Sequence, residues 1–386
     1  MGNTLSFSVT PSEQRRVSLI EAMSGLHADP RGRADAIMVI FFTAAYAFDL
    51  VAVAYMLANR NYPPIRCKSP ILMAGALVSS ILWFVGDIQS KGHVPLKDTP
   101  WNNCKAFGMW IGALLGVYAL GALVAVRALG LIRVFIMGRP FRGRGLYLVL
   151  LAYAVSLLVY GAAVQALPAK KTMYYVDVAD VCDFSKGLQA AVFAVLGFNW
   201  LVVLVLSWHL CSIKSSFNEV FETVVGCLLV FAVLITSIVM HYVMTAYPLN
   251  ATYRILNTSI NHASTQIFWW TIMGVPMFNC LFRRERYLSE WTLKLLSDGL
   301  HNEYDVSGGM GSEKAPLTQQ TGKGSPQAAS PNARYNDAHL GTSRLEVPIA
   351  DGDHSDHSGE PISWPWLTDF QQAKEPQSNR RRFQRW

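Results

Sequence analysis

The sequence predicts an all-α membrane protein: a seven-transmembrane helix bundle with a disordered C-terminal tail. Three observations support this prediction. Of the 386 residues, 52% are hydrophobic and only 15% are charged, whereas soluble domains carry roughly 25% charged residues. Seven apolar runs each approach the length that a helix needs to cross a bilayer. From Gly299 onward the chain is polar and has few aliphatic residues, a composition typical of disorder.

The predicted spans follow from the thickness of the bilayer core, about 30 Å, which takes ~20 helical residues. They are 36–58, 71–88, 106–126, 146–166, 188–210, 223–245 and 266–282. The third run continues in helical pattern to about Met137. The seventh is the shortest and contains Pro276, which membrane helices tolerate where neighbours satisfy the freed carbonyl. Six or eight spans are the alternatives. Four regions result: a leader (1–35), the bundle (36–282), an amphipathic juxtamembrane helix (283–298) and the tail (299–386).

The leader is polar and lacks both the apolar core and the cleavage site of a secretory signal peptide. We therefore expect the first span to act as its own insertion signal. At 35 residues the leader is also too short for an extracellular ligand-binding domain of ordinary size. One motif favours the opposite topology, because residues 1–6 fit the N-myristoylation pattern at Gly2, which requires a cytosolic N-terminus.

The cysteines favour an extracellular leader. Cys104 at the start of span three and Cys182 in loop four lie on one face, and the other four cysteines lie at or near the opposite face. Disulfides persist on the oxidising side of a membrane, so a Cys104–Cys182 bridge would make loops two, four and six extracellular. Two glycosylation motifs, at Asn250 and Asn257, lie in loop six on the same face. The Lys and Arg distribution tilts weakly the same way. We therefore expect a multi-pass plasma-membrane protein with a cytosolic C-terminus.

These features resemble a G-protein-coupled receptor, although not the rhodopsin-type class. The foot of span three, from Arg127 to Phe135, lacks Asp/Glu-Arg-Tyr, and span seven lacks Asn-Pro-x-x-Tyr. The first inner loop, Tyr62-Pro-Pro-Ile-Arg-Cys-Lys-Ser69-Pro70, instead resembles the Pro-Ile-x-x-Arg-Ser-Pro stretch of plant and fungal seven-span proteins. The short third inner loop resembles theirs too. In those families the bundle is often fused to a regulator-of-G-protein-signalling domain, which the tail here lacks. The resemblance covers about residues 35–298.

The resemblance implies a receptor that passes an extracellular signal to a heterotrimeric G protein, with an unknown small ligand and no cofactor. Charged residues within spans are costly and are therefore functional candidates. A Cys104–Cys182 bridge would make loop four a lid, and this lid offers further polar groups. One alternative is that loop four is an ordinary solvated loop. Another is that Asp177, Asp180 and Asp183, at spacing three, share one face of a short helix. The candidate ligand-binding residues are Asp49, Asp87, Tyr174, Tyr175, Asp177, Asp180 and Asp183.

Candidate coupling residues lie at the cytosolic ends of spans three, five and six. We expect Glu222, at the start of span six, to pair with Arg127 or Arg133 in the resting state. The alternative is that these arginines extend to lipid phosphates. The predicted coupling set is Arg127, Arg133, Lys214, Asn218 and Glu222.

Other functions find less support in the sequence. No hydrolase, metalloprotease or phosphate-loop motif is present, so we expect no enzyme and no metal site. Span seven lacks the lysine that a retinal Schiff base requires. The Arg clusters beside apolar runs suit membrane lipid rather than nucleic acid. The remaining alternative is a transporter or ion channel that uses Asp49, Asp87, His209 and His241 as an ion path. An odd span count and the absence of a visible inverted repeat argue against it.

Overall fold

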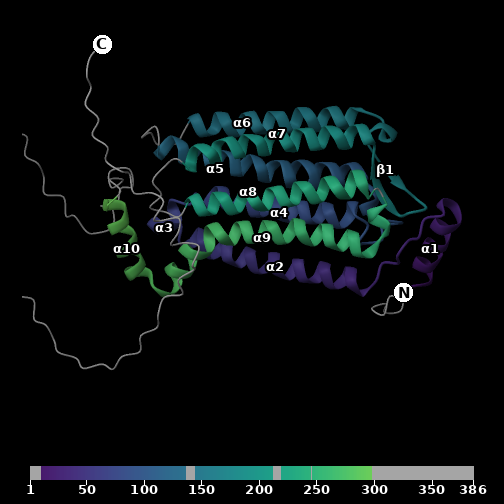
Figure 1. The fold of residues 1–386 in the computed structure, drawn as a ribbon, viewed down its shortest axis with the longest axis horizontal. Helices are drawn as coiled ribbons and strands as arrows, with labels where there is room; N and C mark the ends of the chain where they lie inside the picture. Colours follow the sequence, from purple (N-terminus) through teal and green to yellow (C-terminus); the bar gives the residue numbers. More distant parts are fainter. Residues whose placement is uncertain (1–9, 136–143, 212–218, 245, 298–386) are drawn as a thin grey trace, which may run out of the picture. The chain divides into compact units, whose positions relative to one another are not determined.

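The computed structural model describes residues 10–135, 144–211, 219–244 and 246–297, all within one compact unit, Met1–Lys314. Long helices run side by side through it (Figure 1). They are α2 (Arg33–Ala58), α4 (Pro70–Ser90), α5 (Ala119–Phe135), α6 (Arg144–Ala166), α7 (Lys186–Cys211), α8 (Glu219–Ile238) and α9 (Ala251–Phe282).

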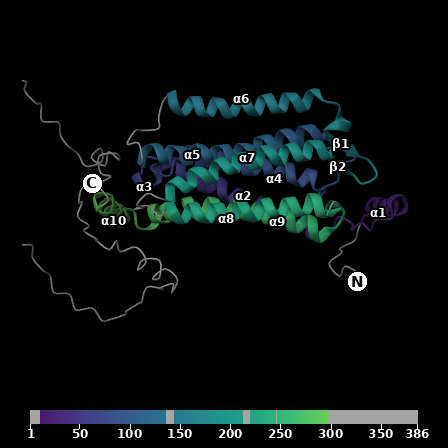
Figure 2. The same cartoon turned by 45° about the horizontal axis from the view of Figure 1, so that its top comes forward.

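Short elements mark the two ends of this bundle. One end carries α1 (Pro11–Ser24) and a β-hairpin, and we name it the hairpin end. The other carries α3 (Pro63–Arg66) and α10 (Arg284–Ser297), and we name it the α10 end. Figures 1 and 2 both place α1 and the strands at one end and α10 at the opposite end. In both views α6 lies at the edge of the bundle.

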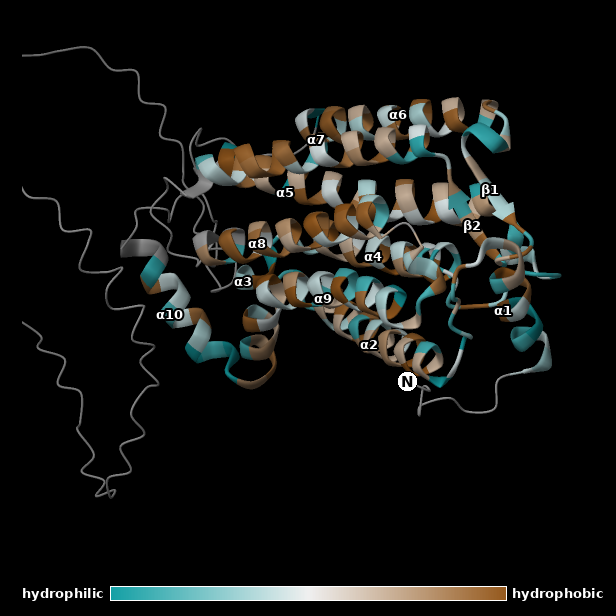
Figure 3. Cartoon of the chain, turned by 45° about the vertical axis from the view of Figure 1, so that its right-hand side comes forward, coloured by the Kyte–Doolittle hydropathy of each residue, from teal (hydrophilic) through white to brown (hydrophobic). Residues whose placement is uncertain are grey.

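Six helices in the described part of the chain are long and apolar enough to cross a membrane. They indicate a membrane-embedded protein, and they match the first six predicted spans to within a few residues at most of their ends. Figure 3 shows apolar residues along these helices, and polar residues concentrated in α1 and α10. The six ranges are Arg33–Ala58, Pro70–Ser90, Lys105–Arg133, Arg144–Ala166, Lys186–His209 and Val224–Val243.

The predicted seventh span lies in α9, a helix of 32 residues that begins well before the expected residue 266. Its first half is polar, so α9 is not among the six apolar helices. It nevertheless packs against α2, α4 and α8. Ile272 and Met273 are fully buried, in one core with Met56 of α2 and Met73 of α4. α9 is therefore an integral part of the bundle.

The third span is a continuous helix in two parts. Its first part, η2 (Lys105–Tyr118), has wide π-helical turns, and α5 follows directly. η2 packs so closely on α4 that a Cβ atom on Gly86 would lie 2.3 Å from the Cα of Gly112. Small residues allow this approach between membrane helices. The predicted continuation of the span is confirmed as far as Phe135, and Met137 lies outside the described residues; the wide turns were not predicted.

The segment between α6 and α7, which is loop four of the sequence prediction, forms an antiparallel hairpin of β1 (Met173–Val176) and β2 (Val181–Phe184), with Tyr175 opposite Cys182. The alternative that Asp177, Asp180 and Asp183 share one face of a short helix is therefore wrong. Asp177 and Asp180 lie in the turn between the strands, and Asp183 lies in β2.

The predicted helix after the bundle is present as α10, and its place at a membrane surface stays a prediction. Trp291 is buried and Leu293 is exposed, so the helix is apolar on more than one face. The Tyr62 hydroxyl donates to the carbonyl of Arg284 at 2.9 Å and holds the start of α10. Cys280, near the end of α9, is buried. The predicted tail lies outside the described residues.

Candidate functional site

A cavity of about 360 Å³ lies among α4, η2–α5, α7, α8 and α9, on the hairpin side of the bundle. Residues 182–184 of β2 line it at the hairpin end. Its polar lining includes Asp87, Ser90, Lys91, Asp183, Lys186, Gln189 and Asn261. Its apolar lining includes Trp83, Val117, Leu120, Phe193, Leu196, Trp200, Val233, Leu234 and Phe268. Mostly apolar walls with a few polar groups are typical of a small-molecule site.

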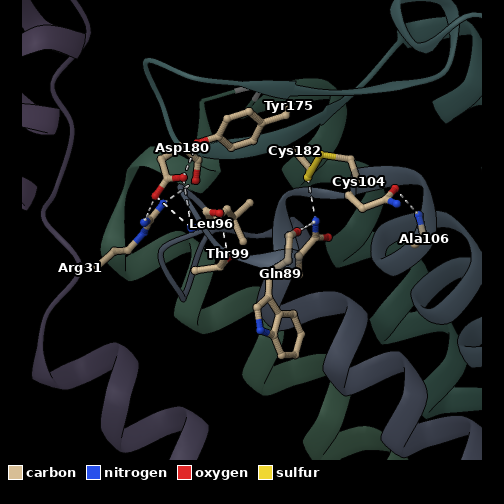
Figure 4. The surroundings of a disulfide bond; sticks show 11 residues. Arg31, Gln89, Leu96, Thr99, Cys104, Ala106, Tyr175, Asp180 and Cys182 are labelled. Carbon is tan, nitrogen blue, oxygen red and sulfur yellow. Dashed lines mark hydrogen bonds and ion pairs between the residues drawn. A yellow bond between two sulfur atoms is a disulfide. The ribbon is translucent and has the colours of Figure 1, made fainter.

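The predicted Cys104–Cys182 disulfide is confirmed. It joins the hairpin to the start of the third span across a sequence separation of 78 residues. Gln89, fully buried at the end of α4, donates to Cys182 Sγ at 2.8 Å and to the carbonyl of Trp101 at 2.8 Å (Figure 4). The bridge therefore fixes β2 against the cavity that its residues line.

Asp180 fixes the turn of the hairpin. It adopts a left-handed conformation (φ 51°), which Asp tolerates better than most residues. Its carboxylate accepts from Arg31 Nη1 at 2.6 Å, from the Tyr175 hydroxyl at 2.7 Å and from the Leu96 amide at 3.1 Å (Figure 4). Burial alone would raise the pKa of Asp180, but these hydrogen bonds outweigh burial and lower the pKa. Burial and the bond to Asp180 both raise the pKa of Tyr175.

The leader folds back onto this hairpin. Arg31 also donates to the carbonyl of Asp180 at 2.6 Å and to that of Gly92 at 2.8 Å. From α1, Arg16 donates to the carbonyl of Ala179 at 3.0 Å and pairs with Glu13. The last part of the leader is thus an ordered strap on the lid.

A second buried carboxylate joins three elements at the hairpin end. Asp35 of α2 accepts from Arg254 of α9 through both oxygens, at 2.8 and 2.6 Å, and from His93 Nδ1 at 2.8 Å. His93 Nε2 lies 2.8 Å from the Thr258 hydroxyl. Because a carboxylate only accepts, His93 donates from Nδ1. Burial lowers the pKa of His93 despite the neighbouring Asp35, so the neutral imidazole is favoured.

Asp87 is the centre of a third cluster, in the wall of the cavity. Its two oxygens accept from Trp83 at 3.1 Å, Lys91 at 2.5 Å, Asn261 at 3.1 Å and His262 at 3.3 Å. Asp87 is buried, although it lies near the end of α4. Asp87 joins α4 to α9.

The predicted ligand-binding residues divide into separate groups. Asp87 and Asp183 line the cavity, whereas Tyr175 and Asp180 hold the hairpin in place. Tyr174 is partly exposed and donates to Asp183 at 3.1 Å. Asp177 is exposed, 3.7 Å from Lys97. Asp49 is buried away from the cavity and accepts from Trp270 at 2.9 Å.

The predicted pairing of Glu222 is confirmed by the structure. Glu222 of α8 accepts from Arg127 of α5 at 3.2 Å and from Lys68, before α4, at 2.6 Å. All three side chains are buried. Arg133 is exposed at the end of α5. Lys214 and Asn218 lie outside the described residues.

A smaller cavity of about 170 Å³ lies beside Glu222 and Arg127. It shares part of its lining with the larger cavity. The shared residues include Val124, Trp200, Gly226, Val230, Leu234 and Phe268. A change in the position of these side chains therefore affects both cavities.

The structure corrects one glycosylation prediction. Asn257 is fully buried within α9, where a glycan does not fit. Asn250 is partly exposed at the start of α9, and its side chain accepts from the Tyr253 amide at 3.2 Å.

Several charged residues of these clusters were missed. Arg254 and His262 were placed in or near loop six because hydropathy alone does not detect that they pair with buried carboxylates. Lys91 carried a usable signal, since a residue four positions after Asp87 lies on the same helix face. Among the described residues, no group of three or more His, Cys, Asp or Glu side chains is placed to hold a metal ion.

No protein-family model and no curated protein matches this sequence.

Proposed function

We propose that this chain is a seven-transmembrane receptor that passes an extracellular signal to a heterotrimeric G protein at the plasma membrane. One observation carries the proposal: two cavities share lining residues along one bundle. The larger lies beneath a disulfide-bonded lid, and the smaller lies beside a buried ion cluster. This arrangement is suited to transmitting a change in occupancy from one end to the other.

The proposed topology places the hairpin end outside the cell. A disulfide at that end favours the oxidising side of the membrane. α9 serves as the seventh span, because Arg254 and His262, which would be costly in lipid, face Asp35 and Asp87 within the bundle. Seven spans then place the leader outside and α10 in the cytosol.

The proposed mechanism is a two-state equilibrium that the ligand biases. In the resting state Glu222 joins α8 to α5 and to Lys68. A ligand in the larger cavity moves the shared side chains, such as Trp200 and Phe268, and so favours a state in which α8 leaves Arg127. The opened cleft would then bind the G protein through Arg127, Arg133 and Glu222, together with Lys214 and Asn218 of the adjoining loop.

The test is reconstitution of the full chain in lipid nanodiscs with candidate Gα subunits and measurement of nucleotide exchange. Under the proposal, at least one Gα exchanges nucleotide faster with the protein than with empty nanodiscs. Arg133→Ala should abolish this acceleration without altering the amount of folded protein. If no Gα class responds, the proposal is wrong.

A second candidate is a transporter or channel, which the buried Asp87, Lys91 and His262 cluster favours. These groups lie inside the bundle beside the cavity, where a proton or ion path would need them. Under this alternative, proteoliposomes would show a flux that Asp87→Asn abolishes and that needs no G protein. The receptor proposal expects no such flux.

A further inference from the structure

The larger cavity is long and narrow along the bundle. On α7 its lining extends from Lys186 to Trp200, which at 1.5 Å per residue corresponds to about 21 Å. On α8 it extends from Ser237 to Gly226, about 16 Å by the same rise. With a volume of about 360 Å³, a space of this length accepts a slim molecule rather than a broad one.

The lining changes from polar to apolar along this length. On α7, Lys186 and Gln189 come first from the hairpin end, followed by Val192, Phe193, Leu196 and Trp200. On α9, Asn261, Ser264 and Thr265 precede Phe268. The complementary ligand therefore has a polar head beneath the hairpin and an apolar chain toward the α10 end.

The polar end of the cavity favours a neutral head. Asp87 and Lys91 neutralise each other at 2.5 Å, and both oxygens of Asp87 already accept hydrogen bonds. At the hairpin end, Asp183 and Lys186 carry opposite charges. The two Asp and two Lys side chains of the lining sum to zero net charge, so a charged head would lose its hydration without a net opposite charge to offset that loss.

One buried group in the cavity wall lacks a partner. Asn261 is 3% exposed and donates from Nδ2 to Asp87, so its Oδ1 is left to accept. Asn261 Oδ1 has no hydrogen-bond partner among the described residues. An unsatisfied buried acceptor is costly, and a ligand that donates to it would remove that cost. Lys91 binds the same Asp87 oxygen, so its ammonium lies beside Asn261 and can donate to the head.

We propose that the cavity binds a neutral single-chain amphiphile whose hydroxyl donates to Asn261 Oδ1 and accepts from Lys91. Its chain lies between α7 and α8. This inference rests on the proposed receptor function, because it names the chemical class of the signal. The hydroxyl can belong to a free long-chain alcohol or to a monoacylglycerol of the bilayer, and the two share the head chemistry.

The test uses the full-length protein in nanodiscs and photolabelling with dodecanol that carries a mid-chain diazirine. We expect saturable labelling of cavity residues on α7 and α8, mapped by mass spectrometry. The matched dodecanoate and dodecylamine probes should label these residues much less. Competition by unlabelled dodecanol added from solution, or by monoacylglycerol supplied in the bilayer, distinguishes the two sources.

Paired variants separate the head from the chain. Asn261→Leu should raise the half-saturating dodecanol concentration about tenfold, the effect of one lost hydrogen bond. Asn279→Leu, the same change elsewhere on α9, should not. Leu234→Trp should block labelling by filling the cavity, whereas Ile235→Trp, its exposed neighbour on α8, should not.

Labelling that does not saturate, equal labelling by a charged probe, or unchanged affinity in both Asn261→Leu and Leu234→Trp would overturn the inference. No G protein is present in this measurement, so it can fail while nucleotide exchange on Gα succeeds. Saturable labelling without any effect on Gα would instead contradict the proposed function and leave the binding intact.

Discussion

At the hairpin end, one covalent bond and three buried carboxylate clusters, on Asp180, Asp35 and Asp87, join the leader, α2, α4, the hairpin and α9. At the α10 end, the described ion pairs between spans centre on Glu222, which joins α8 to α5 and to Lys68. A covalent bond cannot exchange partners within a signalling cycle, whereas an ion cluster can. Under the proposed function, we therefore expect the hairpin end to stay fixed and the α10 end to change between states.

The disulfide should give the largest effect on this comparison. Replacing Cys104 or Cys182 by Ala should lower the thermal unfolding midpoint in nanodiscs, with a loss of up to ~4 kcal/mol in the chain-entropy model. Each single variant and the double variant should lose the same amount, because either change breaks the same bond. Reductant should lower the midpoint of the wild type only. Additive losses would contradict a stabilising bond between the two residues.

Glu222→Gln should have an effect of comparable size. It leaves Lys68 and Arg127 buried without this carboxylate, a change that costs about 3–5 kcal/mol for fully buried pairs. If this cost is larger in the resting state than in the open state by even ~1.4 kcal/mol, the ratio of open to resting protein rises tenfold. Basal nucleotide exchange on Gα should therefore rise.

The matched control is Glu290→Gln on α10, because Glu290 forms an exposed ion pair with Arg286 at 3.0 Å. Exposed pairs contribute little, so basal exchange should stay at the wild-type level. A folded Glu222→Gln protein with wild-type basal exchange would show that the cluster does not restrain α8.

These expectations also show what the sequence could predict. Of the seven apolar runs predicted as spans, six match long apolar helices among the described residues, because burial in lipid selects composition directly. The disulfide was predicted because Cys104 and Cys182 lie on one face, apart from the other cysteines. The pairing of Glu222 with Arg127 was predicted because both residues lie at the same ends of their spans. The first half of α9 was assigned to a loop, because Arg254, Asn257 and His262 lower its hydropathy. Their partners lie far away in sequence, so only the tertiary structure reveals why they are tolerated.

The smallest effect concerns acid pH at the lid. The hydrogen bonds of Asp180 lower its folded-state pKa. A carboxyl group whose pKa is lowered by folding stabilises the folded lid at pH values above its ordinary pKa, about 3.9. This stabilisation is lost as the pH falls through the lower pKa of the folded state. The fluorine NMR signal of a fluorotyrosine at Tyr175 should therefore be constant at neutral pH and change only below the ordinary range.

Two variants check this assignment. Asp180→Asn should shift the Tyr175 signal already at neutral pH and remove the acid transition. Asp177→Asn, on the same loop but exposed, should leave both unchanged. A transition that survives in Asp180→Asn would belong to another group.

The most direct test of the central difference between the two ends is a pair of electron–electron distance measurements in nanodiscs. Spin-labelled unnatural amino acids at Val224 and Ile71 report on the α10 end, and those at Val243 and Ile37 report on the hairpin end; all four positions are exposed. On introducing Glu222→Gln, the Val224–Ile71 distance distribution should move to longer values while the Val243–Ile37 distribution stays unchanged. An unchanged Val224–Ile71 distribution, or a shift at the hairpin end instead, would contradict the account.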